Sequence, residues 1–255
     1  TPLFLTNYQI VNGCQTSNVL FEHRDDLRDI MVNIKVVETQ NEDVFSELVM
    51  ATNSQSKIEN AQFLSLRPII KRIEQFFNTY EIEGKLYLER RERQYVGQDI
   101  PATRIFSVHE AAKCVAAMYC NRPELASRYT KQMYDELTDT LFADDTKEIV
   151  FYAACLTLYR LTLLVSNSTV PQNMKRFKWH MLALVRTIIG GKTQEHLNSR
   201  AAEKSAQAIV DVMAQHGSAA TDVFNKIVKI CQGLGEVTQD RLKRQAILQE
   251  MLAQV

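Results

Sequence analysis

The sequence predicts a predominantly helical α+β fold: a small α/β part over residues 1–105, with about three or four strands, followed by a helical domain over residues 106–255. In the first part, strand-like runs alternate with helical stripes. From residue 107 onward, apolar side chains recur almost only at helical spacing. The 255 residues are 45% hydrophobic and 24% charged, which is typical of a globular protein that buries a substantial core.

Three runs in the first part have strand character. Residues 4–11 are apolar and rich in β-branched side chains, and Asn12-Gly13 follows as a turn. In residues 30–37 (IMVNIKVV), β-branched apolar side chains occupy every second position, as in a half-buried strand. Residues 85–95 (KLYLERRERQY) begin as a strand and run into a charged loop. Helices are expected between these runs, over residues 14–24, 41–52 and 66–80.

The second part is expected to be helical throughout. Ser107 and Glu110 have the spacing of a capping box, so a helix is expected to begin there. The longest apolar run, residues 149–165, is shorter than the about 20 residues of a membrane span and contains Arg160. A buried core helix is therefore predicted, with no membrane contact. Further helical stripes are expected over residues 123–137, 174–188, 202–213, 220–234 and 238–255.

Charge and cysteine content narrow the function classes. Thirty basic and thirty acidic side chains give a formal net charge of zero, so no overall field draws the chain to DNA or to a membrane. Contact with nucleic acid would need a local basic patch. The chain has five cysteines, an odd number, and they are scattered along the sequence. This pattern does not indicate a disulfide framework or a zinc ribbon, and it favours a reducing, cytoplasmic location.

The first polar motif follows the opening strand. A turn at Asn12-Gly13 lets Gly13 adopt a positive φ, and the next helix then points its first amides at the turn. Gln15 and Thr16 add uncharged donors and acceptors at this positive helix end. The arrangement suits a phosphate or a base edge; the alternative is a capped strand-to-helix turn.

A second motif consists of Asn53, Gln55 and Lys57, which alternate in a polar connector between two expected helices. Amide side chains can pair with base edges, and a lysine can neutralise a phosphate. The alternative is a solvated connector that ends the preceding helix.

The third motif contains three arginines and two tyrosines, which are Arg90, Arg91, Arg93, Tyr87 and Tyr95. Guanidinium groups match phosphate oxygens, and a tyrosine can stack on an unpaired base. Glu89 and Glu92 interrupt the positive charge, so an ion-pair ladder on a surface strand is the competing interpretation.

These motifs resemble a known family. Residues 10–17 (IVNGCQTS), 52–58 (TNSQSKI) and 87–95 (YLERRERQY) are similar, in the same order, to signatures of the abortive-infection phage-resistance (AIPR) family. Leu88 stands where the family pattern has a second tyrosine. The resemblance implies a bacterial phage-defence protein, of which this chain would be the C-terminal part of the family domain. An upstream region of the same polypeptide is therefore expected, and some relatives carry a restriction-nuclease-like region there.

The leading hypothesis is a phage-defence fragment that binds DNA, RNA or a nucleotide through its α/β part. The candidate binding residues are Asn12, Gly13, Gln15, Thr16, Asn53, Gln55, Lys57, Arg90, Arg91 and Tyr95. One alternative is a metal-dependent nuclease, because Asp29 and Glu38-Thr39-Gln40 resemble a pattern in which carboxylates hold a divalent metal. The same alternative includes a ParB-like nucleotide hydrolase, since the first turn is also similar to ParB-like families. Another is a helical protein-interaction module that forms homo-oligomers. The sequence assigns no catalytic residue, metal ligand or cofactor, so enzymatic activity stays open.

Overall fold

The structure is a computed structural model that describes residues 6, 8–10, 13–27, 30–39, 64, 67–81, 84–215 and 217–255. The chain divides into two compact units, Thr1–Leu66 and Arg67–Val255. The second unit includes residues 67–105 together with the helices that follow. The domain boundary near residue 105 stays a prediction.

In the first unit, the helix α1 spans Cys14–Glu22. The residue before it, Gly13, has a φ of 93°, which confirms the expected left-handed turn. The hydroxyl of Ser17 donates to the carbonyl oxygen of Gly13 at 3.0 Å and ties the first turn of the helix to that residue.

The strand predicted over residues 30–37 is absent: the described residues 30–39 have no regular secondary structure. Their large apolar side chains are exposed, with Met31 at 92% and Ile34 at 79%. A strand needs a hydrogen-bonded neighbour, and the described part of the first unit contains none. Half of the strand predicted over 4–11 lies outside the described residues, and its described positions, 6 and 8–10, are not in a strand. The helix predicted over 41–52 lies outside the described residues.

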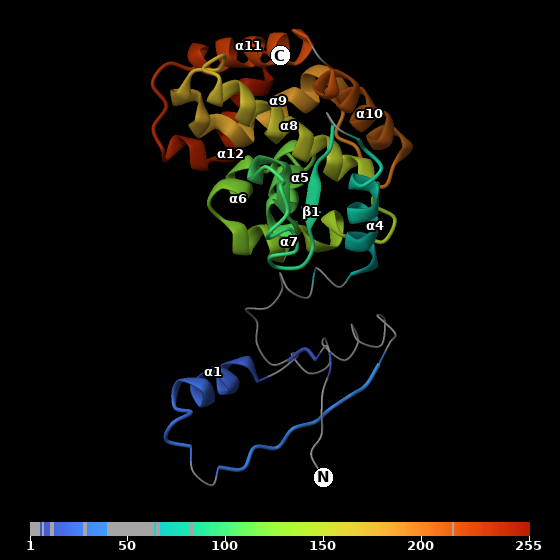
Figure 1. Cartoon of the computed structure of the whole chain (residues 1–255). Helices are drawn as coiled ribbons and strands as arrows, with labels where there is room; N and C mark the ends of the chain where they lie inside the picture. The colour runs from blue at the N-terminus through green and yellow to red at the C-terminus, as the bar shows by residue number, and fades with distance from the viewer. Residues whose placement is uncertain are drawn as a thin grey trace. The chain divides into compact units, whose positions relative to one another are not determined.

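The second unit is mainly helical, as predicted, and Figure 1 labels its elements. Its helices are α4 (Pro68–Phe77), α5 (Val108–Met118), α6 (Pro123–Ser127), α7 (Thr130–Leu141), α8 (Glu148–Ser166), α9 (Lys178–Gly190), α10 (Arg200–Ala214), α11 (Ala219–Gly233) and α12 (Gln245–Leu252). Short 3-10 turns lie at Ala102–Arg104, Gln172–Phe177 and Arg241–Lys243.

A single sheet of two parallel strands forms among the described residues, fewer than the three or four expected. Strand β1 (Tyr87–Glu89) pairs with β2 (Ile105–Ser107), and Leu88 lies opposite Phe106. Both central side chains are buried. The predicted strand over 85–95 is thus confirmed over Tyr87–Glu89, and the charged loop after it leads to the partner strand.

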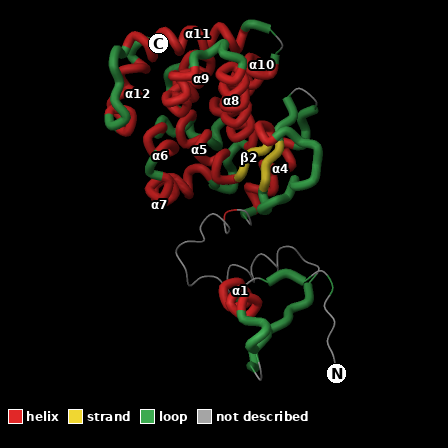
Figure 2. Tube along the Cα trace, turned by 60° about the vertical axis from the view of Figure 1, so that its left-hand side comes forward, coloured by secondary structure: helices red, strands yellow, loops and turns green. Residues whose placement is uncertain are grey.

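Helix α8 forms the centre of this unit. It packs against α4, α5, α9 and α10, and Figures 1 and 2 both show it beside α9 and α10. The helix is long and apolar enough to cross a membrane, but 72% of its most apolar window is buried inside the fold. Arg160, the charge within the run, donates to the last carbonyls of α10, at Met213 and Ala214. The prediction of a core helix is confirmed.

The helix boundaries follow local chemistry in part. The Ser107 hydroxyl accepts the backbone N–H of Glu110 at 3.1 Å, which confirms the predicted cap of α5. The single helix expected over 123–137 is divided, because Arg128 and Tyr129 have non-helical backbone angles between α6 and α7. The helix expected over 238–255 is confined to α12.

His180, on α9, is 2% exposed, and neither ring nitrogen has a hydrogen-bond partner among the described residues. Burial lowers the pKa of this imidazole to about 4, from an ordinary value of 6.5. The folded protein therefore holds His180 neutral where the unfolded chain would bind a proton.

We predict that this histidine makes the protein less stable as pH falls from about 6.5 towards 4, because the unfolded state gains a proton that the folded state excludes. His180→Leu is expected to reduce the loss of unfolding free energy across that window, measured by urea denaturation at several pH values. Met181→Leu, a volume-conserving control on the same helix, is expected to keep the wild-type slope. An unchanged slope in His180→Leu would contradict the prediction.

Candidate functional site

The third motif is positioned by α4 and β1. Helix α4 buries Ile69, Ile70, Ile73 and Phe77 on one stripe, and Glu74 lies beside that stripe. The strand β1 buries its central residue, and the chain then turns into a loop over residues 90–98. The motif therefore occupies a strand and the loop that follows it.

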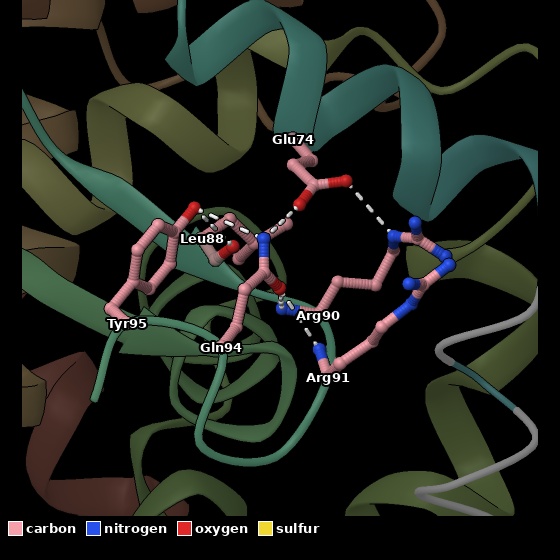
Figure 3. A network of polar contacts seen from close by, with 6 residues as sticks. All are labelled: Glu74, Leu88, Arg90, Arg91, Gln94 and Tyr95. Carbon is pink, nitrogen blue, oxygen red and sulfur yellow. Dashed lines mark hydrogen bonds and ion pairs between the residues drawn. The ribbon is translucent and has the colours of Figure 1, made fainter. Parts of the chain in front are cut away.

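The carboxylate of Glu74 binds this loop at two points, as Figure 3 shows. One oxygen lies 2.9 Å from Nε of Arg90, and the other accepts a hydrogen bond of 2.5 Å from the side-chain amide of Gln94. The side chains of Glu74 and Arg90 are only 14% and 15% exposed. The pair is thus largely shielded from solvent, where an ion pair is screened less than at the surface.

The side chain of Gln94 forms hydrogen bonds with the backbone of its own loop. Its side-chain oxygen accepts the backbone N–H groups of Arg90 at 3.0 Å and Arg91 at 3.1 Å. Its side-chain nitrogen donates to Glu74 and to the hydroxyl of Tyr95, the latter at 3.3 Å. One amide side chain therefore satisfies two main-chain donors and links them to α4.

Tyr95 anchors the far end of the loop to β1. Its hydroxyl donates to the carbonyl oxygen of Leu88 at 3.4 Å, and its ring packs edge-on against Tyr87 with centroids 5.2 Å apart. Burial, and then the charge of Glu74, raise the pKa of Tyr95, so the phenol keeps its proton and remains a donor.

The candidate residues of this motif therefore have different roles. Arg90 and Tyr95 hold the loop against α4 and β1, so their charge and ring are engaged within the fold. The ion pair anticipated for Arg90 exists, with Glu74 on a helix as its partner instead of a neighbour on the strand. Arg91 is exposed, as is Arg93, whose φ of 62° places it in the left-handed region that few non-glycine residues adopt.

Two residues of the network, Glu74 and Gln94, were missed by sequence reasoning. Gln94 lies within the motif, and its position between the arginines and Tyr95 could have indicated a side chain that bonds its own loop. Glu74 lies 16 residues before Arg90 in the sequence, and no local pattern links the two.

The other candidate residues belong to the first compact unit. Gly13 precedes α1 as expected, and Thr16 is exposed on the first turn of that helix. Gln15 lies in the same turn, and the structure describes only its backbone. The remaining candidates also lie outside the described residues; they are Asn12, Asn53, Gln55 and Lys57.

Within the part of the chain that the structure describes, no three histidine, cysteine, aspartate or glutamate side chains gather in a way that could hold a metal ion. The structure therefore assigns no metal ligand among these residues.

Comparison with known proteins gives one family. The family model described as "AIPR protein" matches residues 3–241 and so includes all three motifs and most of both compact units. The chain belongs to the AIPR family. The resemblance read from the first hundred residues is confirmed, and AIPR membership assigns the chain to abortive-infection phage defence. No curated protein and no solved structure matches it.

We predict that Gln94→Ala releases the loop, because two main-chain amides lose their acceptor. Hydrogen exchange across residues 90–95, followed by mass spectrometry, is expected to become about tenfold faster or more, since each lost hydrogen bond is worth about 1 kcal/mol. The control is Gln98→Ala in the same loop, whose side chain makes one long bond of 3.4 Å to the Gln94 carbonyl. Equal exchange in both variants would show that Gln94 does not hold the loop.

Proposed function

We propose that this AIPR-family chain is the nucleic-acid- or nucleotide-recognising part of a cytoplasmic phage-defence protein. Its contact surface would be the loop over residues 90–98 together with the edge of β1. The observation that carries the proposal is the Glu74–Gln94 network, which holds the loop backbone so that Arg91 and Arg93 stand at its surface. A loop fixed in this way loses less conformational entropy when it binds a partner.

The chemistry of the loop suits a phosphate backbone. A guanidinium group offers planar donors that match two phosphate oxygens, and Arg91 and Arg93 are separated by one residue. Tyr87, half-buried at the start of the motif, supplies an aromatic ring that packs against Tyr95. The left-handed backbone of Arg93 supports a functional role, because strained conformations persist mainly where a site requires them.

The charge balance favours contact with a few phosphates over contact with a long stretch of the nucleic-acid backbone. Glu89 and Glu92 alternate with the arginines, and the whole chain carries no net charge. Few phosphates would therefore be neutralised at once, and binding should depend only moderately on salt. A nucleotide or a single strand fits this surface better than a long duplex.

The first two motifs belong to the first compact unit and would keep their own predicted binding role there. Gly13, Gln15 and Thr16 precede or open α1, whose N-terminal amides suit a phosphate. Asn12 and the connector with Asn53, Gln55 and Lys57 would add amide and lysine contacts. No observation on the described residues favours the nuclease, the nucleotide hydrolase or the oligomerisation module over this proposal.

We predict that Arg91→Ala combined with Arg93→Asn weakens binding of a short single-stranded DNA or RNA about tenfold or more, since a hydrogen bond to a charged group is worth about 1.5–3 kcal/mol. Asparagine is chosen at position 93 because it tolerates a positive φ. Fluorescence anisotropy at several salt concentrations would measure both affinity and salt dependence, and the salt slope should decrease.

The matched control for that experiment is Lys226→Ala combined with Lys229→Ala, which removes two exposed charges from α11. This variant is expected to bind like the wild type. If the wild-type chain binds neither DNA nor RNA at low salt, or if both variants bind equally, the proposed contact of this loop with a nucleic-acid strand is wrong.

A further inference from the structure

We infer that a cavity beside this loop is a pocket for a single nucleotide, with the phosphate at Lys85 and Arg104 and the base beside Tyr80 and Tyr87. The inference rests on the proposed function and deepens it, because it names a ligand class and a set of residues outside the original candidates. Tyr87 belongs to both the third motif and the cavity wall.

The cavity has a volume of about 560 Å³ and lies between the end of α4, the start of β1 and the turn that leads into β2. Small-molecule pockets usually measure roughly 300–1,000 Å³. The side chains used in the argument come from two tyrosines, two cations and two acids, and they are Tyr80, Tyr87, Lys85, Arg104, Glu81 and Asp99.

Two cations, Lys85 and Arg104, are among the lining residues. The ammonium of Lys85 lies 3.2 Å from the carbonyl oxygen of Asn78 and 3.5 Å from its side-chain oxygen, and both of these acceptors are uncharged. The guanidinium of Arg104 donates to the carbonyl oxygen of Lys85 at 2.7 Å and lies 5.1 Å from the ring centroid of Tyr159. The backbone of one cation thus positions the side chain of the other, as a phosphate site would require.

Two tyrosine rings line the wall in fixed orientations. The ring of Tyr80 stacks on Tyr152, with centroids 3.7 Å apart and planes inclined by 9°. The hydroxyl of Tyr152 donates to the carbonyl oxygen of Gly84, where a Cβ atom would lie only 2.7 Å from that hydroxyl. Gly84 therefore permits this close approach and brings Lys85, the next residue, to the cavity.

The ring of Tyr87 packs edge-on against Tyr95, which the loop network anchors to β1. Both lining tyrosines are half-buried, and the ammonium of Lys85 lies 5.4 Å from the ring centroid of Tyr87. Stacking of a base on such a ring is worth about 1–3 kcal/mol, and it tolerates every base. The rings would therefore contribute affinity without choosing among bases.

The two carboxylates would discriminate among the bases. Glu81 and Asp99 are acceptors, and exocyclic amino groups of cytosine, adenine and guanine are donors. Uracil and thymine have no such amino group. Two acids beside two cations also disfavour a ligand with many negative charges. The chemistry points to a nucleoside monophosphate, or one nucleotide of a strand, with an amino-bearing base.

Isothermal titration of the full chain with AMP, CMP, GMP, UMP and inorganic phosphate tests this pocket. Binding of the amino-bearing nucleotides is expected, with UMP about fivefold weaker or more, because one lost base contact is worth about 1 kcal/mol or more. Inorganic phosphate alone is expected to bind weakest. Equal binding of phosphate and nucleotides, or no nucleotide binding, would overturn the inference.

Variants then locate the site. Lys85→Gln is expected to weaken nucleotide binding about tenfold, since it removes a charged donor, and Lys85→Arg is expected to restore much of the affinity. Lys229→Gln on α11 is the control and should bind like the wild type. Thermal unfolding of each variant checks folding. Wild-type affinity in a folded Lys85→Gln variant would place the nucleotide elsewhere and overturn the inference.

The two proposals fail in different ways. Loss of strand binding in the Arg91/Arg93 variant, with mononucleotide binding retained, would support separate contacts by the loop and the pocket. Mononucleotide binding by a wild-type chain that binds no strand would remove the proposed strand recognition and keep the pocket. Strand binding without any mononucleotide binding would remove the pocket and keep the loop.

Discussion

The carboxylate of Glu74 is the interaction on which the arrangement of the third motif depends. Each of its oxygens takes one partner from the loop, the guanidinium of Arg90 and the amide of Gln94. A carboxylate that is only 14% exposed would be costly without such partners, because it has lost most of its hydration. These two contacts hold the loop against α4. Gln94 also accepts the backbone N–H groups of Arg90 and Arg91, so the conformation of the loop backbone depends on the same carboxylate.

This constraint divides the family motif into two kinds of residue. Arg90, Gln94 and Tyr95 face inward and determine the conformation of the loop, whereas Arg91 and Arg93 are exposed. Arginines that look equivalent in the sequence therefore differ in burial and in their contacts in the structure. A family signature can thus describe the scaffold of a site as much as its contacts.

Local chemistry explains what the sequence could predict. The cap at Ser107, the positive φ of Gly13 and the buried run that became α8 each depend on residues within a few positions of one another. The segment 30–37 shows the limit of such patterns, because alternation describes a strand only when a neighbour pairs with it. In the described part of its unit, that neighbour is missing.

The nucleotide pocket could not be predicted for a related reason. Lys85 and Arg104 are 19 residues apart, and the parallel pairing of β1 with β2 brings the segments that carry them to the same place. Tyr80 gains its orientation from Tyr152, on a helix far along the chain. No spacing rule links these residues, so tertiary contacts alone assemble the cavity.

A double-mutant cycle on Glu74 and Arg90 tests the central claim most directly. Unfolding free energies of the wild type, Glu74→Ala, Arg90→Ala and the double variant would be measured by urea denaturation at neutral pH. The account predicts that each single variant is destabilised and that the double variant loses less than the sum, with a coupling of about 1–3 kcal/mol. Additivity within about 0.5 kcal/mol would contradict it, because the two side chains would then act independently.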